Sequence, residues 1–233
     1  VRLYSRVLTD DEVMTLYIMG APYGQNQSLP NNCPDIGDRC DDGTIYAGIS
    51  PDGSVEMYTT PEDAGLMHWN NDNTNYTDVS GVAGSANAGM SNTLGLVITD
   101  SDSVAAGFQT HFAAQYCYDF VFGGNDDWYL PAPNEMLVLY NNRVALGNFD
   151  VSGEEYWTSE QGGSNSGRTV IFSNGNLNGS DKHVDERVRC VRKGPAPRCA
   201  NPYGLEGSMF YNTTHDVMQY CDGGRWVGIG KQN

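Results

Sequence analysis

The sequence predicts an α+β fold in which two helices are embedded among short strands. Three observations support this class. Alternating apolar and polar residues over 44–59 are typical of a β-hairpin, and apolar residues at intervals of four over 104–121 indicate an amphipathic helix. The later strand-like segments are separated by loops of glycine, asparagine and serine. With 233 residues, of which 39% are hydrophobic, the chain is long enough to bury a sizeable core.

The N-terminal residues 1–20 are predicted to form a strand followed by a helix. Thr9 and Glu12 have the spacing of a capping box, and Gly20 ends the helical pattern. Residues 21–42 are rich in proline, asparagine and glycine, and we interpret them as a linker with a cysteine loop. The chain begins with neither a signal peptide nor an initiator methionine, so we expect it to be a fragment of a longer protein.

Residues 43–194 form the predicted main domain. Its hairpin pairs residues 44–49 with residues 55–59 around a Pro-Asp-Gly turn. The first helix covers Val104–Val121, and a second begins near Pro133 and continues through Tyr140. Three later strands are expected at Tyr156–Ser159, Arg168–Ser173 and Arg187–Arg192. Residues 195–233 form a separate small unit, with strands expected at 207–212, 217–221 and 225–229.

The six cysteines indicate a disulfide framework in an exported protein. No Cys-x-x-Cys pair occurs, so zinc ribbons and thioredoxin-type redox motifs have no support. Two cysteines flank a short loop, two others bracket the C-terminal unit, and the remaining two would tie a helix to a late strand. Many pairings are possible, but position favours Cys33–Cys40, Cys199–Cys221 and Cys117–Cys190.

The net charge of −16 is unevenly distributed along the chain. No lysine or arginine occurs between Arg39 and Arg143, whereas this stretch holds many carboxylates. Six of the 13 basic residues cluster near the end of the main domain: Lys182, Arg187, Arg189, Arg192, Lys193 and Arg198. A mostly acidic surface disfavours nucleic acids, anionic membranes and sulfated polymers as partners. No apolar run is long enough to span a bilayer, so we expect no membrane insertion.

Ordered motifs over residues 43–193 resemble the Lcl C-terminal-domain family of bacterial surface proteins. These motifs are Tyr46–Gly53, Tyr58–Pro61, His68–Asn70, Ala113–Cys117, Asp127–Pro131, Glu135–Leu139, Tyr156–Ser159 and Val188–Arg192. The resemblance implies a C-type-lectin-like fold, with two helices packed on short strands and the late cysteine bonded to the helix cysteine. It also implies a secreted adhesin, fibre or phage tail protein, and some such domains bind polysaccharides.

The two ends of the chain carry weaker resemblances. Residues 1–20 resemble the closing segment of a laminin-G or concanavalin-like jelly roll, through Arg2, Tyr4, Arg6, Leu8, Glu12 and Val13. Residues 195–233 resemble a short cysteine module appended to bacterial and prophage surface proteins, through Cys199, Tyr211, Cys221 and Trp226.

No motif predicts an enzyme. The Gly-x-Ser-x-Gly and His-Glu-x-x-His patterns are absent. Val188–Arg192 also resembles the end of formylglycine-generating enzymes, but these depend on a reactive cysteine pair, and we expect Cys190 to be structural. His68, His111 and His215 are isolated, so packing or surface roles are favoured over catalysis. We therefore predict a protein without enzyme activity.

No metal or other cofactor is predicted, although calcium is a minor alternative. Asn70–Asn75 is rich in oxygen ligands but lacks the glycine and closing glutamate of an EF-hand loop. Asp181, His183 and Asp185 would share one face only if their segment were extended. The competing interpretation of that segment is a solvated turn before the last strand.

The predicted ligand surface is the loop region Gly162–Asp185. Short amide side chains on loops over a rigid scaffold suit the recognition of hydroxyl groups. The candidate ligand-binding residues are Asn165, Asn174, Asn176, Asn178, Asp181 and His183. Trp69, Trp128, Tyr156 and Trp157 could stack on sugar rings, but their positions in the motifs favour the core.

These observations together predict an extracellular binding or adhesion module. We expect it to belong to a bacterial surface appendage or a phage fibre, at the cell surface or on a virion. Its expected partner is a cell-surface glycan or receptor, and homo-oligomers are expected. The alternative is a structural subunit of a fibre, filament or virion without a small ligand.

Overall fold

A computed structural model describes residues 33–53, 55–71 and 76–194, together with short strand segments beyond residue 197. The larger sheet comprises, in spatial order, β3 (Gly65–Met67), β7 (Glu186–Val188), β4 (Glu155–Gly163), β5 (Ser166–Ile171) and β6 (Leu177–Asp181). The smaller sheet comprises β1 (Ile45–Ile49), β2 (Glu56–Thr59) and β8 (Val191–Lys193). The described helices are α2 (Gly89–Ile98), α3 (Phe112–Asp119) and α4 (Pro133–Leu146).

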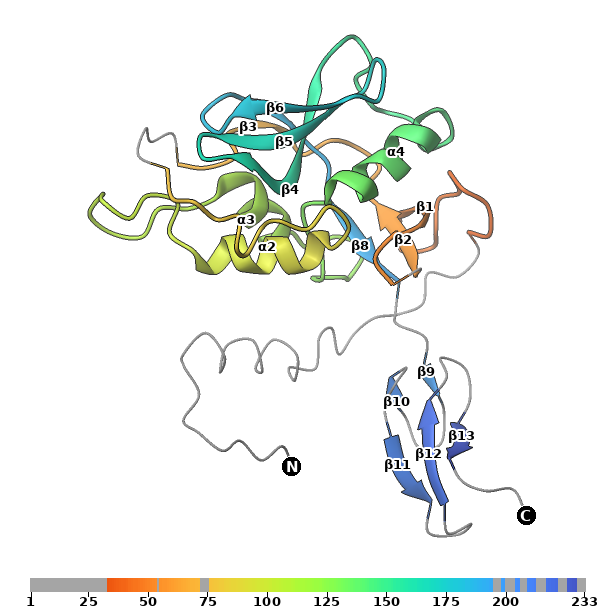
Figure 1. Cartoon of the computed structure of the whole chain (residues 1–233). Helices are drawn as coiled ribbons and strands as arrows, with labels where there is room; N and C mark the ends of the chain where they lie inside the picture. Colours follow the sequence, from red (N-terminus) through yellow and green to blue (C-terminus); the bar gives the residue numbers. More distant parts are fainter. Residues whose placement is uncertain are drawn as a thin grey trace, which may run out of the picture.

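The helices and sheets form a mixed arrangement that is consistent with the predicted α+β class. In Figure 1, α2 and α3 lie together beneath the larger sheet, and α4 lies between β4 and β1. Neighbouring strands are antiparallel, except that β4 and β7 are parallel through the pair Tyr156 and Arg187. The late strands β7 and β8 therefore join the two sheets through a short connection at Arg189 and Cys190.

The predicted hairpin is confirmed as β1 and β2. The register runs from Ile45 opposite Thr59 to Ile49 opposite Glu56, with a bulge between Tyr46 and Gly48. Gly48 has a φ of 110°, and a Cβ atom there would lie 3.3 Å from the side-chain amide of Asn142 in α4. Glycine therefore allows both the left-handed conformation and the close approach of α4 to the hairpin.

The prediction of one helix over Val104–Val121 is wrong in extent. The helix α3 begins only at Phe112 and ends at Asp119, and residues before it form turns. The Asp100 carboxylate accepts hydrogen bonds from the backbone amides of Asp102 and Gln109, each at 3.0 Å. These local bonds offer the backbone an alternative to a helix.

The helix α2 was not predicted from the sequence. Its segment includes two glycines, and its buried face includes Asn92 and Thr93 beside Leu96, so no apolar stripe marks it. Gly95 packs so close to Val82 that a Cβ atom would lie 2.8 Å from the valine side chain. Close packing of backbone on backbone therefore overrides weak helix propensity here.

The predicted helix near Pro133 is confirmed as α4, and a buried carboxylate fixes its start. Glu135 is fully buried, and its Oε2 accepts hydrogen bonds from the backbone amides of Ala132 at 2.9 Å and Gly89 at 3.1 Å. Its Oε1 accepts from the hydroxyls of Tyr129 at 2.8 Å and Ser50 at 2.9 Å. Burial raises the pKa of Glu135, and these four donors oppose that cost.

The predicted aromatic core is confirmed. Trp69, Trp128, Tyr156 and Trp157 are each at most 1% exposed. The indole N–H groups donate to backbone carbonyls, for example Trp69 to Thr158 and Trp157 to Met67, both at 2.8 Å. Since the polar atom of each ring is hydrogen-bonded within the protein, these residues pack the core and are not available to stack on a ligand.

Two of the three predicted disulfides are confirmed. Cys33 is bonded to Cys40, and Cys117 of α3 is bonded to Cys190. The side chains of Cys199 and Cys221 lie outside what the structure describes, so their pairing stays a prediction. Residues 33–42, which we interpreted as part of a linker, pack on the domain: the Gly37 amide donates to the Tyr46 carbonyl at 2.9 Å.

The terminal segments are described only in part. Beyond residue 197, β11 (Met209–Asn212), β12 (Val217–Cys221) and β13 (Trp226–Ile229) agree with the three predicted strands, and they form an antiparallel sheet. β9 (Arg198–Cys199) pairs with β10 (Gly204–Leu205). The predicted strand and helix over 1–20 and the first part of the predicted linker lie outside the described residues. No helix in the described part of the chain is long and apolar enough to cross a membrane.

A buried histidine at the start of α3 predicts an acid-sensitive fold. His111 is 1% exposed, its Nδ1 lies 3.0 Å from the Leu96 carbonyl, and its ring meets Trp69 edge-on at 5.3 Å. Burial lowers the pKa of His111 to about 4. At pH values between the usual histidine pKa and about 4, His111 binds a proton in the unfolded chain but not in the folded domain. Acidification in this range therefore lowers the free energy of unfolding.

We expect His111 to lower the free energy of unfolding by about 2 kcal/mol when the pH falls from 7 to 5. Urea unfolding of the natural protein and of His111→Gln at both pH values measures this difference. The variant should be less sensitive to acid by that amount. Equal pH dependence in the two proteins would contradict the assignment, because all other titrating groups are common to both.

Candidate functional site

The six residues predicted to bind a ligand are all exposed, but the structure divides them between two ends of the β5–β6 hairpin. Asn174 and Asn176 lie in the turn that joins the two strands, and Asn178 follows in β6. Asp181 ends β6 at the opposite end, opposite Ser166, and Asn165 and His183 lie beside it in turns. The six therefore form two small groups rather than one site.

The Asp181–Asp185 segment is a turn, as in the competing interpretation, and not an extended strand. The Val184 amide donates to the Asp181 carbonyl at 2.8 Å. The two flanking side chains face different partners: His183 Nδ1 lies 2.7 Å from the Tyr76 hydroxyl, and Asp185 lies 3.4 Å from His68 Nε2. The shared face that an extended segment would create is therefore absent from this turn.

The other calcium candidate is only partly described. Residues 72–75 of the Asn70–Asn75 loop lie outside the described residues, whereas Asn71 accepts a hydrogen bond from Ser101 at 3.0 Å. Within residues 33–53, 55–71 and 76–194, no three histidine, cysteine or carboxylate side chains are grouped so that they could hold a metal ion.

A hollow on the described surface lies between the β2–β3 connection and α3. It has a volume of about 330 Å³, within the usual range of ligand pockets. Its lining combines aromatic rings with a few polar groups: Arg39, Thr60, Pro61, Glu62, Asp63, Ala64, Tyr116, Phe120, Phe122 and Cys190. We call it the first hollow.

A buried arginine holds the β2–β3 wall of the first hollow in place. The side chain of Arg189 is 0% exposed and lies in the short connection between β7 and β8. It donates to the Asp63 carboxylate at 2.7 Å, the Thr60 carbonyl at 2.6 Å and the Asn148 carbonyl at 2.7 Å. One guanidinium thus fixes two residues that line the hollow, Thr60 and Asp63.

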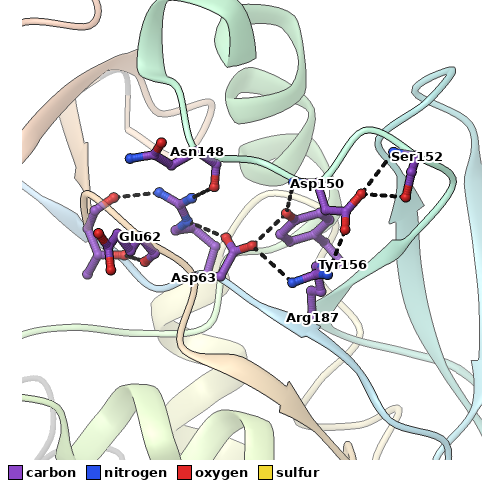
Figure 2. Close-up of polar contacts among 9 residues, drawn as sticks. Glu62, Asp63, Asn148, Asp150, Ser152, Tyr156 and Arg187 are labelled. Atoms are coloured by element: carbon purple, nitrogen blue, oxygen red, sulfur yellow. Dashed lines mark hydrogen bonds and ion pairs between the residues drawn. The ribbon is translucent and has the colours of Figure 1, made fainter.

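The network in Figure 2 continues from Asp63 to the larger sheet. Asp63 also accepts a hydrogen bond from the Tyr156 hydroxyl at 2.7 Å, and it lies 3.8 Å from Arg187. Arg187 in turn donates to Asp150 at 2.6 Å. Burial raises the pKa of Tyr156 above its usual range, and the neighbouring Asp63 carboxylate raises it further, so the hydroxyl stays a donor. The wall is therefore fixed to β4 and β7.

The opposite wall of the first hollow is a row of stacked aromatic rings. Phe120 stacks between Tyr116, at 5.6 Å between ring centres and 24° between planes, and Phe122, at 6.1 Å and 14°. The disulfide from Cys117 to Cys190 bonds this part of α3 to the connection that carries Arg189. Both walls therefore depend on two adjacent residues, Arg189 and Cys190.

A second hollow of about 510 Å³ continues along α3. It shares Tyr116 and Phe120 with the first hollow. Its other lining residues are Met67, Phe112, Gln115, Asp119 and Val121. The two hollows adjoin at these two rings, and we call the pair the α3 groove.

The ionic groups of the α3 groove are mostly carboxylates. Glu62 is exposed at its rim, and Asp119 lies beside the second hollow, where it accepts a hydrogen bond from Gln115 at 2.8 Å. Arg39 is the single cationic group among the lining residues. Such a lining can accept hydrogen bonds from hydroxyl groups and stack on apolar ring faces, whereas a polyanion would meet repulsion.

Four members of the basic cluster near the end of the main domain are paired with carboxylates within the fold, and a fifth is buried. Arg187 pairs with Asp150, Arg189 with Asp63, Arg192 with Asp127, and Lys193 with Asp52. Lys182 is buried against the Trp69 ring and donates to Gln161 at 2.9 Å. Three of these aspartates come from the stretch that contains no lysine or arginine. The described members of the cluster, Lys182 to Lys193, therefore give no free basic surface for a sulfated ligand, and the side chain of Arg198 lies outside the described residues.

Sequence reasoning missed the α3 groove. The apolar residues at intervals of four, among them Phe112, Tyr116 and Phe120, predict an amphipathic helix, whose apolar face would be buried. Phe112 and Tyr116 are in fact 43% and 38% exposed, whereas Ala113, Ala114 and Cys117 form the buried face of α3. The small residues Ala113 and Ala114 next to the cysteine were the signal for that face.

Comparison with known proteins adds no family assignment: the chain matches no protein-family model, and no curated protein shows significant sequence similarity to it.

Proposed function

We propose that the protein is a non-enzymatic extracellular binding module that recognises a glycan or receptor on a surface. The supporting observation is the α3 groove, whose first hollow offers about 330 Å³ lined by aromatic rings and carboxylates between two fixed walls. Ligand sites of this kind are apolar hollows with a few well-placed polar groups. Attachment to a bacterial surface appendage or a phage fibre, and assembly into homo-oligomers, belong to the same proposal.

The rigidity of the groove supports a binding role. The Cys117–Cys190 disulfide fixes one wall, and the Arg189–Asp63 ion pair fixes the other. Preformed walls reduce the entropy that is lost when a ligand binds. Disulfides also persist in oxidising compartments, which supports the extracellular location.

A glycan array with the whole chain, probed with and without Ca²⁺, tests the proposed function. We expect binding to uncharged glycans, no selective binding to sulfated ones, and no dependence on Ca²⁺. If no glycan bound and the protein assembled into filaments, the alternative of a structural subunit would replace the binding proposal. Light scattering on the same sample measures the assembly.

A further inference from the structure

We infer that the α3 groove binds an uncharged oligosaccharide across at least two sugar rings, with Tyr116 and Phe120 between the two subsites. This inference rests on the proposed function and specifies its ligand class and its site. The observation that carries it is the sharing of these two rings by both hollows, which places two compartments next to each other at Tyr116 and Phe120.

The dimensions and chemistry of the two compartments differ. The first hollow has Phe120 and Phe122 on one side and Glu62 at its rim, so it combines an exposed carboxylate with a ring surface, whereas Thr60 and Asp63 are already bonded within the wall. The second hollow is more apolar, with Met67 and Phe112 beside Gln115 and Asp119. A sugar ring in the first would be held by hydroxyl contacts and stacking, and a following ring in the second mainly by stacking.

The charge of the groove selects among ring-containing polymers. Nucleic acids and sulfated glycans present closely spaced anions, which Glu62 and Asp119 would repel, with Arg39 as the single lining cation to offset them. Asp63 is paired with Arg189 and also accepts a hydrogen bond from Tyr156, so both of its oxygens already have partners in the wall. A polymer with uncharged rings and hydroxyl groups fits this lining, because its hydroxyls can donate to the carboxylates.

Two tyrosines of α3 supply a matched pair of variants. Tyr116 lines both hollows and is 38% exposed, whereas Tyr118 is 39% exposed and lines neither. Both are replaced by alanine in the whole chain. Binding is measured by calorimetry with neutral gluco-, manno-, galacto- and N-acetylhexosamine oligosaccharides of increasing length, and heparin serves as the anionic probe.

We expect an oligosaccharide to bind about tenfold more tightly than the corresponding monosaccharide, since it fills both compartments. Tyr116→Ala should weaken oligosaccharide binding about tenfold, whereas Tyr118→Ala should leave it unchanged. Phe112→Ser changes only the second hollow, so it should weaken the oligosaccharide and leave the monosaccharide unaffected. Thermal unfolding of each variant shows that the fold is intact.

The outcomes separate this inference from the proposed function. If neutral glycans bind but Tyr116→Ala and Tyr118→Ala behave alike, the protein binds glycans elsewhere and the α3 groove assignment is overturned. Loss of binding in Asn178→Ala instead would locate the site on the β5–β6 hairpin. Selective binding of heparin overturns the ligand class. If the natural protein binds none of the probes, both the proposed function and this inference fail.

Discussion

Replacing Arg189 with methionine is expected to lower the free energy of unfolding by about 3–5 kcal/mol. The substitution removes three hydrogen bonds, to Asp63 and to the carbonyls of Thr60 and Asn148, and it leaves the Asp63 carboxylate without its closest cation. The side chain is 0% exposed, so little water is available to replace these bonds. A buried charge that loses its partner carries the full cost of its burial.

Urea unfolding measures this effect, and two further variants calibrate it. Arg189→Lys keeps the charge but cannot reproduce three bonds from one planar group, so an intermediate loss is expected. Arg168→Met removes an arginine whose side chain is 43% exposed and 4.0 Å from Glu160, and it should cost less than about 1 kcal/mol. If Arg189→Met and Arg168→Met cost the same, Arg189 does not hold the wall of the α3 groove.

The fold class follows from local patterns, and the structure agrees where those patterns are strong. The hairpin β1–β2 contains residues that favour a tight turn, and the helix α4 begins with a proline, which is favoured at the first helical position. The helix α2 carries no such signal, because its buried Asn92 and Thr93 find their partners outside the helix, and Asn92 also bonds with the preceding Ser85. Asn92 donates to Ser159 at 3.1 Å, and Thr93 donates to the Leu130 carbonyl at 3.2 Å. Tertiary contacts of this kind are invisible to periodicity.

The candidate site was likewise only partly predictable, because some of its features are local in the sequence and others depend on contacts between distant residues. Exposed asparagines between strands are visible in the sequence, but their distribution over two ends of β5–β6 depends on strand register. The walls of the α3 groove come from residues more than a hundred positions apart, such as Thr60 and Arg189. Only the pairing of Cys117 with Cys190 was a sequence-level indication that α3 lies beside that late connection.

Ion pairs within the domain explain the uneven distribution of charge along the chain. Asp52, Asp63 and Asp127 lie in the stretch without lysine or arginine, and each pairs with a basic residue of the late cluster. The Arg192–Asp127 pair is almost fully buried, with side chains 0% and 2% exposed. The acidic and basic segments are thus complementary parts of one domain, and the surface excess of carboxylates comes from the acidic residues that remain.

Removal of the Cys117–Cys190 disulfide in the double variant Cys117→Ala/Cys190→Ala is expected to cost about 4 kcal/mol. The two cysteines are separated by 73 residues, so the bond restricts a long loop in the unfolded chain. Both residues also lie in the buried cluster with Trp69, Trp128 and Trp157, where the lost sulfur atoms leave a cavity. Urea unfolding under oxidising conditions measures the loss, and peptide mapping without reduction identifies the pairing in the natural protein.

The second described disulfide is the control, because it differs in loop length but not in kind. Cys33 and Cys40 are separated by 7 residues, so the variant Cys33→Ala/Cys40→Ala should cost only about 2 kcal/mol. The first variant should also weaken ligand binding, since α3 would lose its bond to the connection that carries Arg189, whereas the second should not. If the two variants were equally stable and bound alike, the disulfide would not determine the position of α3, and the rigidity on which the binding proposal depends would have to come from packing alone.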